Sequence, residues 1–351
     1  MTKRLVLGAG GAANAIAARA LAVGRADQRA AGGHDRAARH GERQQLSYPN
    51  DYRAVLYTPA SLDRSRPAPL VVMLHGCGTT AEQIEGASQL DQLAEREHFV
   101  VLYPDAAQPR GRCWRFGRDY ERSSPDPAAI AGMVRDAISR RAPAIDSTRV
   151  YVAGMSSGAA MTAVLGATYP DVFAAIAINA GCAYRADHCG GRTPSRPSEE
   201  LAREALDAMG ANRRVVQVLT AQGDKDKVVP GHSQQILDQW RMTDNLVAGG
   251  TTDGPIRVVP TRTREAAPRG RYRTTVDRYD AAPGCEVLER WTIHGMGHFW
   301  PGGTTDPVYA PFTDPRGPDG EDMIWSFFRR FRLTTGSDPS GCAAGPAVAG
   351  A

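Results

Sequence analysis

The residues best suited to chemistry lie in Gly154-Met155-Ser156-Ser157-Gly158, a Gly-x-Ser-x-Gly element. A short apolar run at 150–153 precedes it, and an Ala-rich stretch that favours a helix follows it. This order predicts a strand, a tight turn and a helix, which together place a serine hydroxyl at the sheet edge and at a helix N-terminus. An ordinary glycine-rich turn is the alternative. The flanking patterns favour Ser156 as a nucleophile.

A nucleophilic serine needs a base that takes its proton. Two of the eight histidines, His294 and His298, lie in a glycine-framed segment directly after the last predicted strand. In hydrolases with a serine elbow the base follows the nucleophile and the acid in the chain, so this is the expected place. We predict His298 as the base and His294 as the end of the strand.

The base needs a carboxylate that orients it. The predicted strand at 215–220 leads into a loop that contains Asp224 and Asp226, between the serine and the histidines. Position alone does not choose between these two residues. Either one could instead be a solvated turn residue paired with a neighbouring lysine.

Backbone N–H groups must also hold the developing oxyanion. His75-Gly76-Cys77 directly follows the apolar run at 70–74, so the Cys77 N–H can turn toward the site and join the N–H of Ser157. Cys77 as a nucleophile is disfavoured, because no base is linked to it and a disulfide partner is available.

The elements that must position these residues alternate along the chain. Apolar runs typical of buried strands are separated by helical stretches, which predicts an α/β fold with a mostly parallel sheet and helices on both faces. The segment at 182–212 is either a small cap over the site or a surface excursion, and 246–273 is an irregular insert. Besides the helix after Ser156, we expect strands at 52–57, 70–74, 99–103, 150–153, 173–179, 215–220, 274–279 and 287–293, and helices at 82–97, 128–141, 199–209 and 322–331.

Charge and composition exclude several classes of function. The net charge is +4, but residues 1–45 hold eight Lys and Arg against three acidic residues. The remainder of the chain is therefore nearly neutral and lacks the excess of basic residues that is typical of nucleic-acid-binding proteins. No apolar stretch is long enough for a membrane span. Six cysteines at separated positions do not form a zinc pattern, so we expect no metal.

The N-terminal segment contains a formal dinucleotide fingerprint at 8–13. We reject it, because residues 27–45 are polar and Arg-rich and cannot supply the second strand that such a site requires. We therefore expect no cofactor. Residues 1–45 are interpreted as a leader, a targeting or a disordered segment, although Arg19 and Asn14 make it a poor secretory signal.

Five motifs are distributed along the chain: Leu74-His-Gly-Cys77, Cys113-Trp114, the serine element, Gly223-x-x-Asp226-x-x-Val229 and Gly297-His-x-Trp-Pro-Gly-Gly303. Together they resemble the polyhydroxybutyrate depolymerase and esterase family of α/β-hydrolases, which includes feruloyl and acetyl-xylan esterases. The resemblance covers roughly 46–331, and its most specific part is the His-x-Trp-Pro-Gly-Gly element at 298–303.

The resemblance implies a triad of Ser156, Asp226 and His298, and thereby favours Asp226 over Asp224. It implies oxyanion donors at Cys77 and Ser157. It also implies that Trp114 and Trp300 line the acyl or polymer groove, with plain core aromatics as the alternative. Two residues depart from the family pattern: Gln222 replaces a more usual His, and Ser157 replaces a more usual Ala.

The expected function is hydrolysis of carboxylic esters, either short-chain hydroxyalkanoate polyesters and oligomers or feruloyl and acetyl-xylan esters. A catalytically silent binding module of the same fold is the alternative from another class. We expect one catalytic domain at 46–333, a disordered tail at 334–351 and an extracellular or periplasmic location; the oligomeric state stays open. Expected disulfides are Cys77–Cys113, Cys182–Cys189 and Cys285–Cys342.

Overall fold

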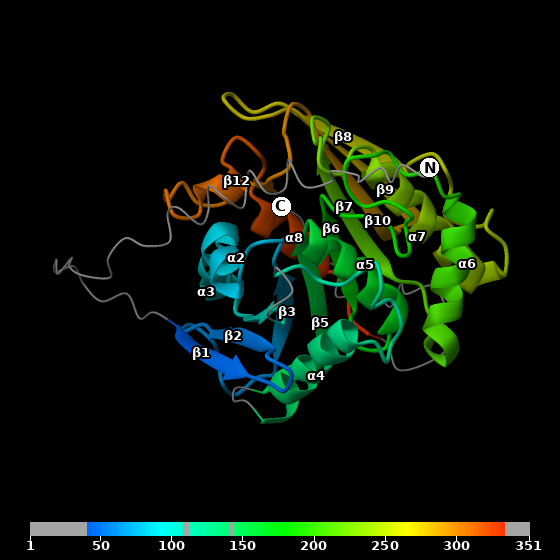
Figure 1. Ribbon diagram of the computed structural model, residues 1–351. Helices are drawn as coiled ribbons and strands as arrows, with labels where there is room; N and C mark the ends of the chain where they lie inside the picture. The colour runs from blue at the N-terminus through cyan, green and yellow to red at the C-terminus, as the bar shows by residue number, and fades with distance from the viewer. Residues whose placement is uncertain (1–40, 108–111, 141–143, 334–351) are drawn as a thin grey trace, which may run out of the picture.

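A computed structural model describes residues 41–107, 112–140 and 144–333 (Figure 1). Its main element is a ten-stranded sheet with the order β1-β2-β4-β3-β5-β6-β7-β10-β9-β8. The six central strands β4, β3, β5, β6, β7 and β10 run parallel, and the outer strands at both edges are antiparallel. The strands are β1 Glu42–Ser47, β2 Arg53–Thr58, β3 Ala68–Leu74, β4 Val100–Asp105, β5 Ile145–Met155, β6 Ala175–Asn179, β7 Gln217–Gly223, β8 Arg262–Ala266, β9 Thr274–Ala282 and β10 Cys285–Ile293.

Helices cover both faces of the sheet (Figure 1). Side chains in strand β3 alternate between the two faces, as the period of two requires. Leu70, Val72 and Leu74 pack with the helices α4, α5, α6 and α7, whereas Val71 and Met73 pack with α2, α3 and α8. The helices are α2 Ala81–Ser88, α3 Leu90–Glu97, α4 Pro125–Arg140, α5 Ser157–Thr168, α6 Ser198–Met209, α7 His232–Gly249 and α8 Gly320–Phe328. The predicted α/β architecture is confirmed.

Three expectations about individual elements need correction. The single helix expected at 82–97 is two helices, because Gln89 adopts a left-handed backbone with φ +57° and ends α2. The sheet begins at Glu42 rather than at 46, since β1 pairs along its whole length with β2. The insert at 246–273 contains strand β8 at the sheet edge.

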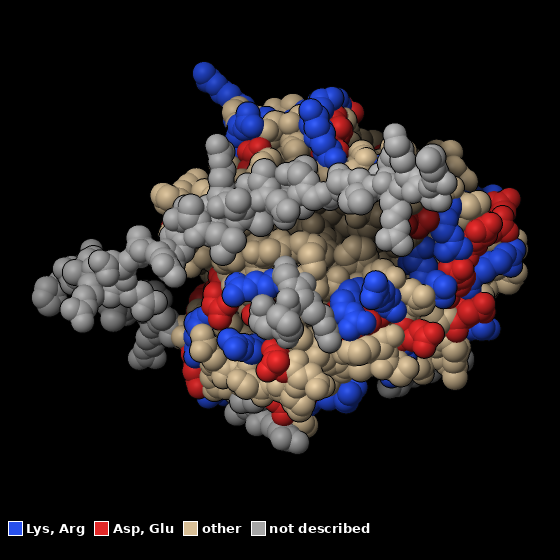
Figure 2. Space-filling model, viewed as in Figure 1, with Lys and Arg blue, Asp and Glu red and all other residues tan. Residues whose placement is uncertain are grey.

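The insert that follows β6 extends the outer helical layer. Its helix α6 is tied to α7, where the Gln239 amide donates to the carbonyl of Leu201 (3.0 Å) and the Thr243 hydroxyl to that of Ala202 (3.3 Å). Acidic and basic side chains are interspersed over α6 on the outer surface (Figure 2). Helix α6 is therefore part of the outer helical layer. The residues before it contact the loop after β7 at the sheet edge, where the Gly191 N–H donates to the Val228 carbonyl (2.7 Å).

Two of the expected disulfides, Cys77–Cys113 and Cys182–Cys189, are present. Cys342, the expected partner of Cys285, lies outside the described residues, as do the fingerprint at 8–13 and the tail at 334–351. Among the helices of the described ranges, none combines the length and apolarity that crossing a membrane requires.

Helix α5 is buried along its whole length, so its small residues set how closely it lies on the sheet. A Cβ on Gly166 would come within 2.6 Å of the Ile176 side chain in β6 and 3.0 Å of Trp240 in α7. Only a glycine allows this approach without movement of a neighbour.

Gly166→Ala is expected to lower the free energy of unfolding by about 1–3 kcal/mol, because the added methyl overpacks the core. Gly249→Ala, at the end of α7, is the matched control, since a Cβ there would meet no atom within 4 Å. Urea unfolding of both variants measures the difference. Equal stability of the two variants would contradict the packing argument.

A polar cluster ties the edge strand β1 to the α2–α3 side of the sheet. The Arg43 guanidinium donates two hydrogen bonds of 2.8 Å to Glu85, and the Tyr103 hydroxyl donates to Asp91 (2.7 Å). Burial raises the pKa of Asp91 to about 7, and the nearby Glu85 carboxylate adds to the shift. Protonated Asp91 is therefore the form that the folded state prefers.

The raised pKa makes stability depend on pH. The stabilisation by protonated Asp91 is fully present below the ordinary carboxyl pKa and is lost as the pH rises to about 7. Asp91→Asn mimics the neutral form, so it is expected to raise the urea midpoint at pH 8 relative to wild type by more than it does at pH 5. A difference between variant and wild type that is the same at both pH values would refute the assignment.

Candidate active site

The predicted serine elbow is a sharp turn between β5 and α5. Ser156 has φ +57° and ψ −119°, a backbone conformation that side-chain-bearing residues rarely adopt. A Cβ on Gly158 would lie 2.3 Å from the Leu74 carbonyl oxygen, and one on Gly154 would lie 2.3 Å from Gly158 itself. Both glycines are thus required where β3, β5 and α5 meet. This is the geometry that distinguishes a nucleophile elbow from an ordinary turn.

The loops after β7 and β10 bring Asp226 and His298 together. Nδ1 of His298 lies 2.8 Å from Oδ2 of Asp226, whose side chain is fully buried. The other carboxylate oxygen accepts the backbone N–H groups of Val228 (2.8 Å) and Val229 (3.0 Å). Since the carboxylate accepts at Nδ1, that nitrogen carries the proton and Nε2 is left to accept one.

The environment of Asp226 favours its charged form. Burial alone would raise the pKa of this carboxyl, but the hydrogen bond and charge of His298, together with the two backbone N–H groups, outweigh it and hold the pKa below the usual value. The carboxylate is therefore ionised at neutral pH and can orient and stabilise the imidazole.

The second candidate acid forms a separate pair with the second candidate base. Asp224 accepts from His294 at Nδ1 (3.1 Å) and from the Gly295 N–H (2.8 Å). Nε2 of His294 is engaged with the Thr275 hydroxyl at 2.9 Å. With both ring nitrogens occupied, His294 has a structural role at the end of β10, and the geometry favours the pair Asp226–His298.

Backbone hydrogen bonds join the acid loop to the base loop. Asp224 N–H donates to the Ile293 carbonyl (3.1 Å), and Lys225 N–H to that of Met296 (3.0 Å). Gly223 permits the approach, because a Cβ there would lie 2.2 Å from the Met296 oxygen. The relative position of acid and base is therefore set by main-chain contacts.

Gln222, noted as a departure in the sequence, supports the acid loop. Its amide nitrogen donates to the Val229 carbonyl and lies 3.4 Å from Oδ2 of Asp226, while its oxygen accepts the Ser233 N–H (2.9 Å). The buried side chain thus connects the start of α7 to the turn that presents the acid.

A buried asparagine that the sequence analysis did not single out links the nucleophile to the base loop. The carbonyl of Asn179 accepts the Ser156 N–H (3.1 Å), and its side-chain amide donates to the Phe299 carbonyl (3.4 Å), next to His298. The only sequence signal was a polar residue at the end of the apolar run at 175–178.

The predicted oxyanion segment lies against the nucleophile. A Cβ on Gly76 would sit 3.4 Å from Cβ of Ser156 and 4.0 Å from its hydroxyl oxygen, so the loop after β3 borders the serine directly. The Cys77 thiol is consumed in the disulfide with Cys113, which excludes it as a nucleophile in this oxidised form. Ser157 opens helix α5, where its N–H has no intrahelical partner.

The groove-lining role of the two tryptophans is corrected. Trp114 is 2% exposed and donates its indole N–H to the His75 carbonyl (3.1 Å), and Trp300 is fully buried against α8. Both are core aromatics, the alternative that the sequence left open. The spacing of apolar residues in a sequence does not show whether a tryptophan lines a groove or lies in the core.

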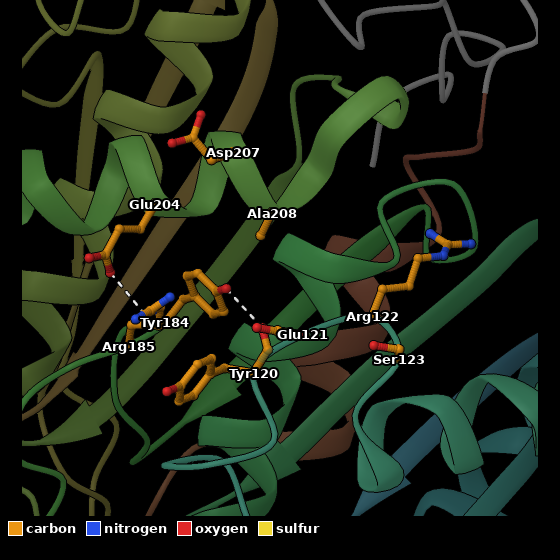
Figure 3. Close-up of a pocket in the computed structure, with 9 residues that line it drawn as sticks. All are labelled: Tyr120, Glu121, Arg122, Ser123, Tyr184, Arg185, Glu204, Asp207 and Ala208. Carbon is orange, nitrogen blue, oxygen red and sulfur yellow. Dashed lines mark hydrogen bonds and ion pairs between the residues drawn. The ribbon is translucent and has the colours of Figure 1, made fainter.

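Two pockets lie near these elements, one beside helix α6 and one behind the loop that carries Asp226. A pocket of about 590 Å³ lies between the loop at 120–123, the segment after β6 and helix α6 (Figure 3). Among its charged groups, Arg185 pairs with Glu204 (3.1 Å) and stacks over Tyr120. None of the described residues that line this pocket is a histidine.

The smaller pocket, about 290 Å³, includes Asp226, Gln222 and Ser233 in its lining and reaches the acid loop from the α7 side. No group of three His, Cys, Asp or Glu side chains suited to a metal occurs in the part of the chain that the structure describes.

Comparison with known proteins supports the motif-based resemblance. Residues 51–194 match the family model described as "Esterase PHB depolymerase". The resemblance to this esterase family is confirmed. Feruloyl esterase B from Neurospora crassa is 34% identical over 161 residues, which are 45% of this chain and 53% of that protein. Poly(3-hydroxyalkanoate) depolymerase C from Paucimonas lemoignei is 28% identical over 268 residues, 72% of this chain and 59% of the depolymerase. This chain thus spans little more than half the length of these two relatives.

The fold is that of the α/β-hydrolases, as the likeness to a solved structure shows. The acetyl xylan esterase from Aspergillus awamori superimposes with a TM-score of 0.59 at 24% identity, over 74% of this chain and 94% of that one. At this level of identity the likeness concerns the fold alone.

Substitution of each acidic residue tests which of the two orients the base. Asp226→Asn is expected to lower kcat toward p-nitrophenyl butyrate on the order of 1,000- to 10,000-fold, because an amide at this position favours the wrong imidazole tautomer. Asp224→Asn, two residues away, changes the carboxylate that contacts His294 and Gly295 and is the matched control. If the two variants lose activity equally, the choice of Asp226 is wrong.

Proposed function

We propose that this protein is a serine esterase that hydrolyses carboxylic esters through Ser156, His298 and Asp226. The observation that carries the proposal is the strained elbow at Ser156, at the same edge of the sheet as the buried Asp226–His298 pair. The family resemblance supports it, since relatives with matching segments are named as esterases and depolymerases.

In the proposed reaction, Nε2 of His298 takes the proton of the Ser156 hydroxyl as its oxygen attacks the ester carbonyl. The N–H groups of Cys77 and Ser157 hold the oxyanion, and Asp226 stabilises the imidazolium. The proton then passes to the leaving alcohol, and an acyl-enzyme remains. Water, deprotonated by His298, attacks the acyl-enzyme and releases the acid and free Ser156.

The substrates we propose are short-chain hydroxyalkanoate polyesters or their oligomers. The depolymerase from Paucimonas lemoignei, which aligns over 72% of this chain, supports this class. Feruloyl or acetyl-xylan esters are the second candidate, supported by the acetylxylan esterase from Coprinopsis cinerea, 28% identical over 75% of this chain and 70% of that protein.

The disulfides indicate that the protein works in an oxidising compartment. Disulfides persist outside the cytosol, and two are present in the described residues. We therefore propose that the enzyme works in the extracellular space or the periplasm.

A panel of esters tests both the chemistry and the substrate class. Wild type is expected to cleave p-nitrophenyl butyrate and to prefer hydroxybutyrate oligomers over methyl ferulate and acetylated xylan. Ser156→Ala removes the attacking oxygen and is expected to abolish hydrolysis of every ester in the panel. Rates of product release for both proteins measure the difference.

A fluorophosphonate probe provides the control for a silent fold. It is expected to label wild type at Ser156 and to leave Ser156→Ala unlabelled, whereas a binding module would take no label in either form. Full activity of Ser156→Ala would overturn the proposed nucleophile, and a preference for ferulate or acetylxylan would reassign the substrate.

A further inference from the structure

The carbonyl of Gly76, beside the candidate nucleophile, is held by an unusual number of donors. It accepts from Nδ1 of His75 (2.7 Å), from the Thr79 hydroxyl (2.8 Å) and from the Thr79 N–H (3.3 Å). The last bond closes a turn in which Gly78 has φ +74°. None of these groups belongs to the proposed triad.

The orientation of this carbonyl decides where the next N–H points. Gly76 O and Cys77 N–H belong to one trans peptide unit, so they point in opposite directions. With the oxygen drawn toward His75 and Thr79, the Cys77 N–H faces away from them. Gly76 itself borders the Ser156 hydroxyl, as its close approach to Cβ and Oγ of Ser156 shows.

His75 can act only as a donor toward this oxygen. A carbonyl oxygen accepts and never donates, so Nδ1 of His75 carries a proton. On the other side of the ring, Nε2 accepts the Ala106 N–H (3.1 Å), and Oδ1 of Asp105 lies 3.1 Å from the same nitrogen. The imidazole is fully buried and is therefore fixed by contacts at both nitrogens.

The segment 112–114 holds the same turn through a disulfide and two hydrogen bonds. Cys113 forms the disulfide with Cys77, the Arg112 carbonyl accepts the Gly78 N–H (3.2 Å), and the Trp114 indole donates to the His75 carbonyl. The peptide units before and after Gly76 are thus held by separate partners.

We propose that His75 and Thr79 are positioning residues, which lock the Gly76–Cys77 peptide so that the Cys77 N–H is aimed at the oxyanion. The inference rests on the proposed serine esterase function and assigns to these two side chains a role within it. Without the donors, the peptide unit can rotate and turn the carbonyl oxygen toward the developing negative charge. The loss then falls on the transition state and spares ground-state binding.

Thr79 offers the cleaner test, because Val and Ser separate its shape from its hydroxyl. Thr79→Val is expected to lower kcat for p-nitrophenyl butyrate at least about tenfold, with KM changed less than about twofold. Thr79→Ser keeps the donor and is expected to retain kcat within about twofold. Affinity for butylboronic acid, a mimic of the tetrahedral intermediate, is expected to weaken in Thr79→Val by the same factor as kcat.

Thr80→Val is the matched structural control. Thr80 caps helix α2 by accepting the Gln83 N–H (3.3 Å), and its hydroxyl does not contact Gly76. This variant is expected to lose stability in urea while keeping kcat, so a general loosening of the loop can be separated from a loss of positioning. His75→Asn, which keeps a donor near the Nδ1 position, is expected to retain more activity than His75→Leu.

The experiments separate failure of the positioning role from failure of the proposed esterase function. An unchanged kcat in Thr79→Val beside an active wild type would overturn the positioning role, and so would an equal loss in Thr80→Val. If wild type cleaves no ester, the proposed function fails, and the crystal structure of Thr79→Val then decides this inference alone. A rotated Gly76–Cys77 peptide supports it, and an unmoved peptide overturns it.

Discussion

The structure depends on the close contact between the turn at Ser156 and the end of strand β3. Helix α5 can begin beside β3 only because Gly158 has no side chain where the Leu74 carbonyl lies. That contact forces Ser156 into its left-handed, strained backbone and places its hydroxyl beside Gly76. Strain of this kind, about 1–3 kcal/mol, persists only where surrounding packing imposes it. The fully buried helix α5 and the parallel strands on either side of β5 provide that packing.

The remaining parts of the site follow from the order of the strands. The loops after β3, β5, β7 and β10 all leave the same edge of the sheet, since these strands are parallel. A residue from each loop therefore reaches a common region without a long connection. Asn179, at the end of β6, fills the interval between the serine and base loops and joins both through its backbone and side chain.

The sequence predicted the features that depend on local order. The strand, Gly-x-Ser-x-Gly and helix pattern located the elbow, and the apolar runs located the parallel core strands. Helix α7 was missed because its buried face carries polar residues such as Gln239 and Asp244, which obscure the apolar periodicity. The break at Gln89 depends on a left-handed residue that is not a glycine, which a sequence pattern rarely reveals.

Choices between neighbouring residues required three-dimensional contacts. Asp224 and Asp226 look alike along the chain, and only the pairing with His294 or His298 tells them apart. The tryptophans were misplaced for the same reason, because burial is a property of the assembled layers. His75 was read only as part of an oxyanion segment, and its contact with the Gly76 carbonyl appears only when the turn is closed.

The backbone bonds between the acid and base loops have a consequence for how such a protein can change. Because Lys225, Asp224 and Gly223 meet the base loop through main-chain atoms, the framework does not rely on the identity of the reactive side chains. A chain that lost the serine hydroxyl would keep the same loops at the same separation. A change of Ser156 to alanine would therefore remove the attacking oxygen and leave the main-chain framework around it unchanged, so loss of catalysis on this scaffold does not require loss of the fold.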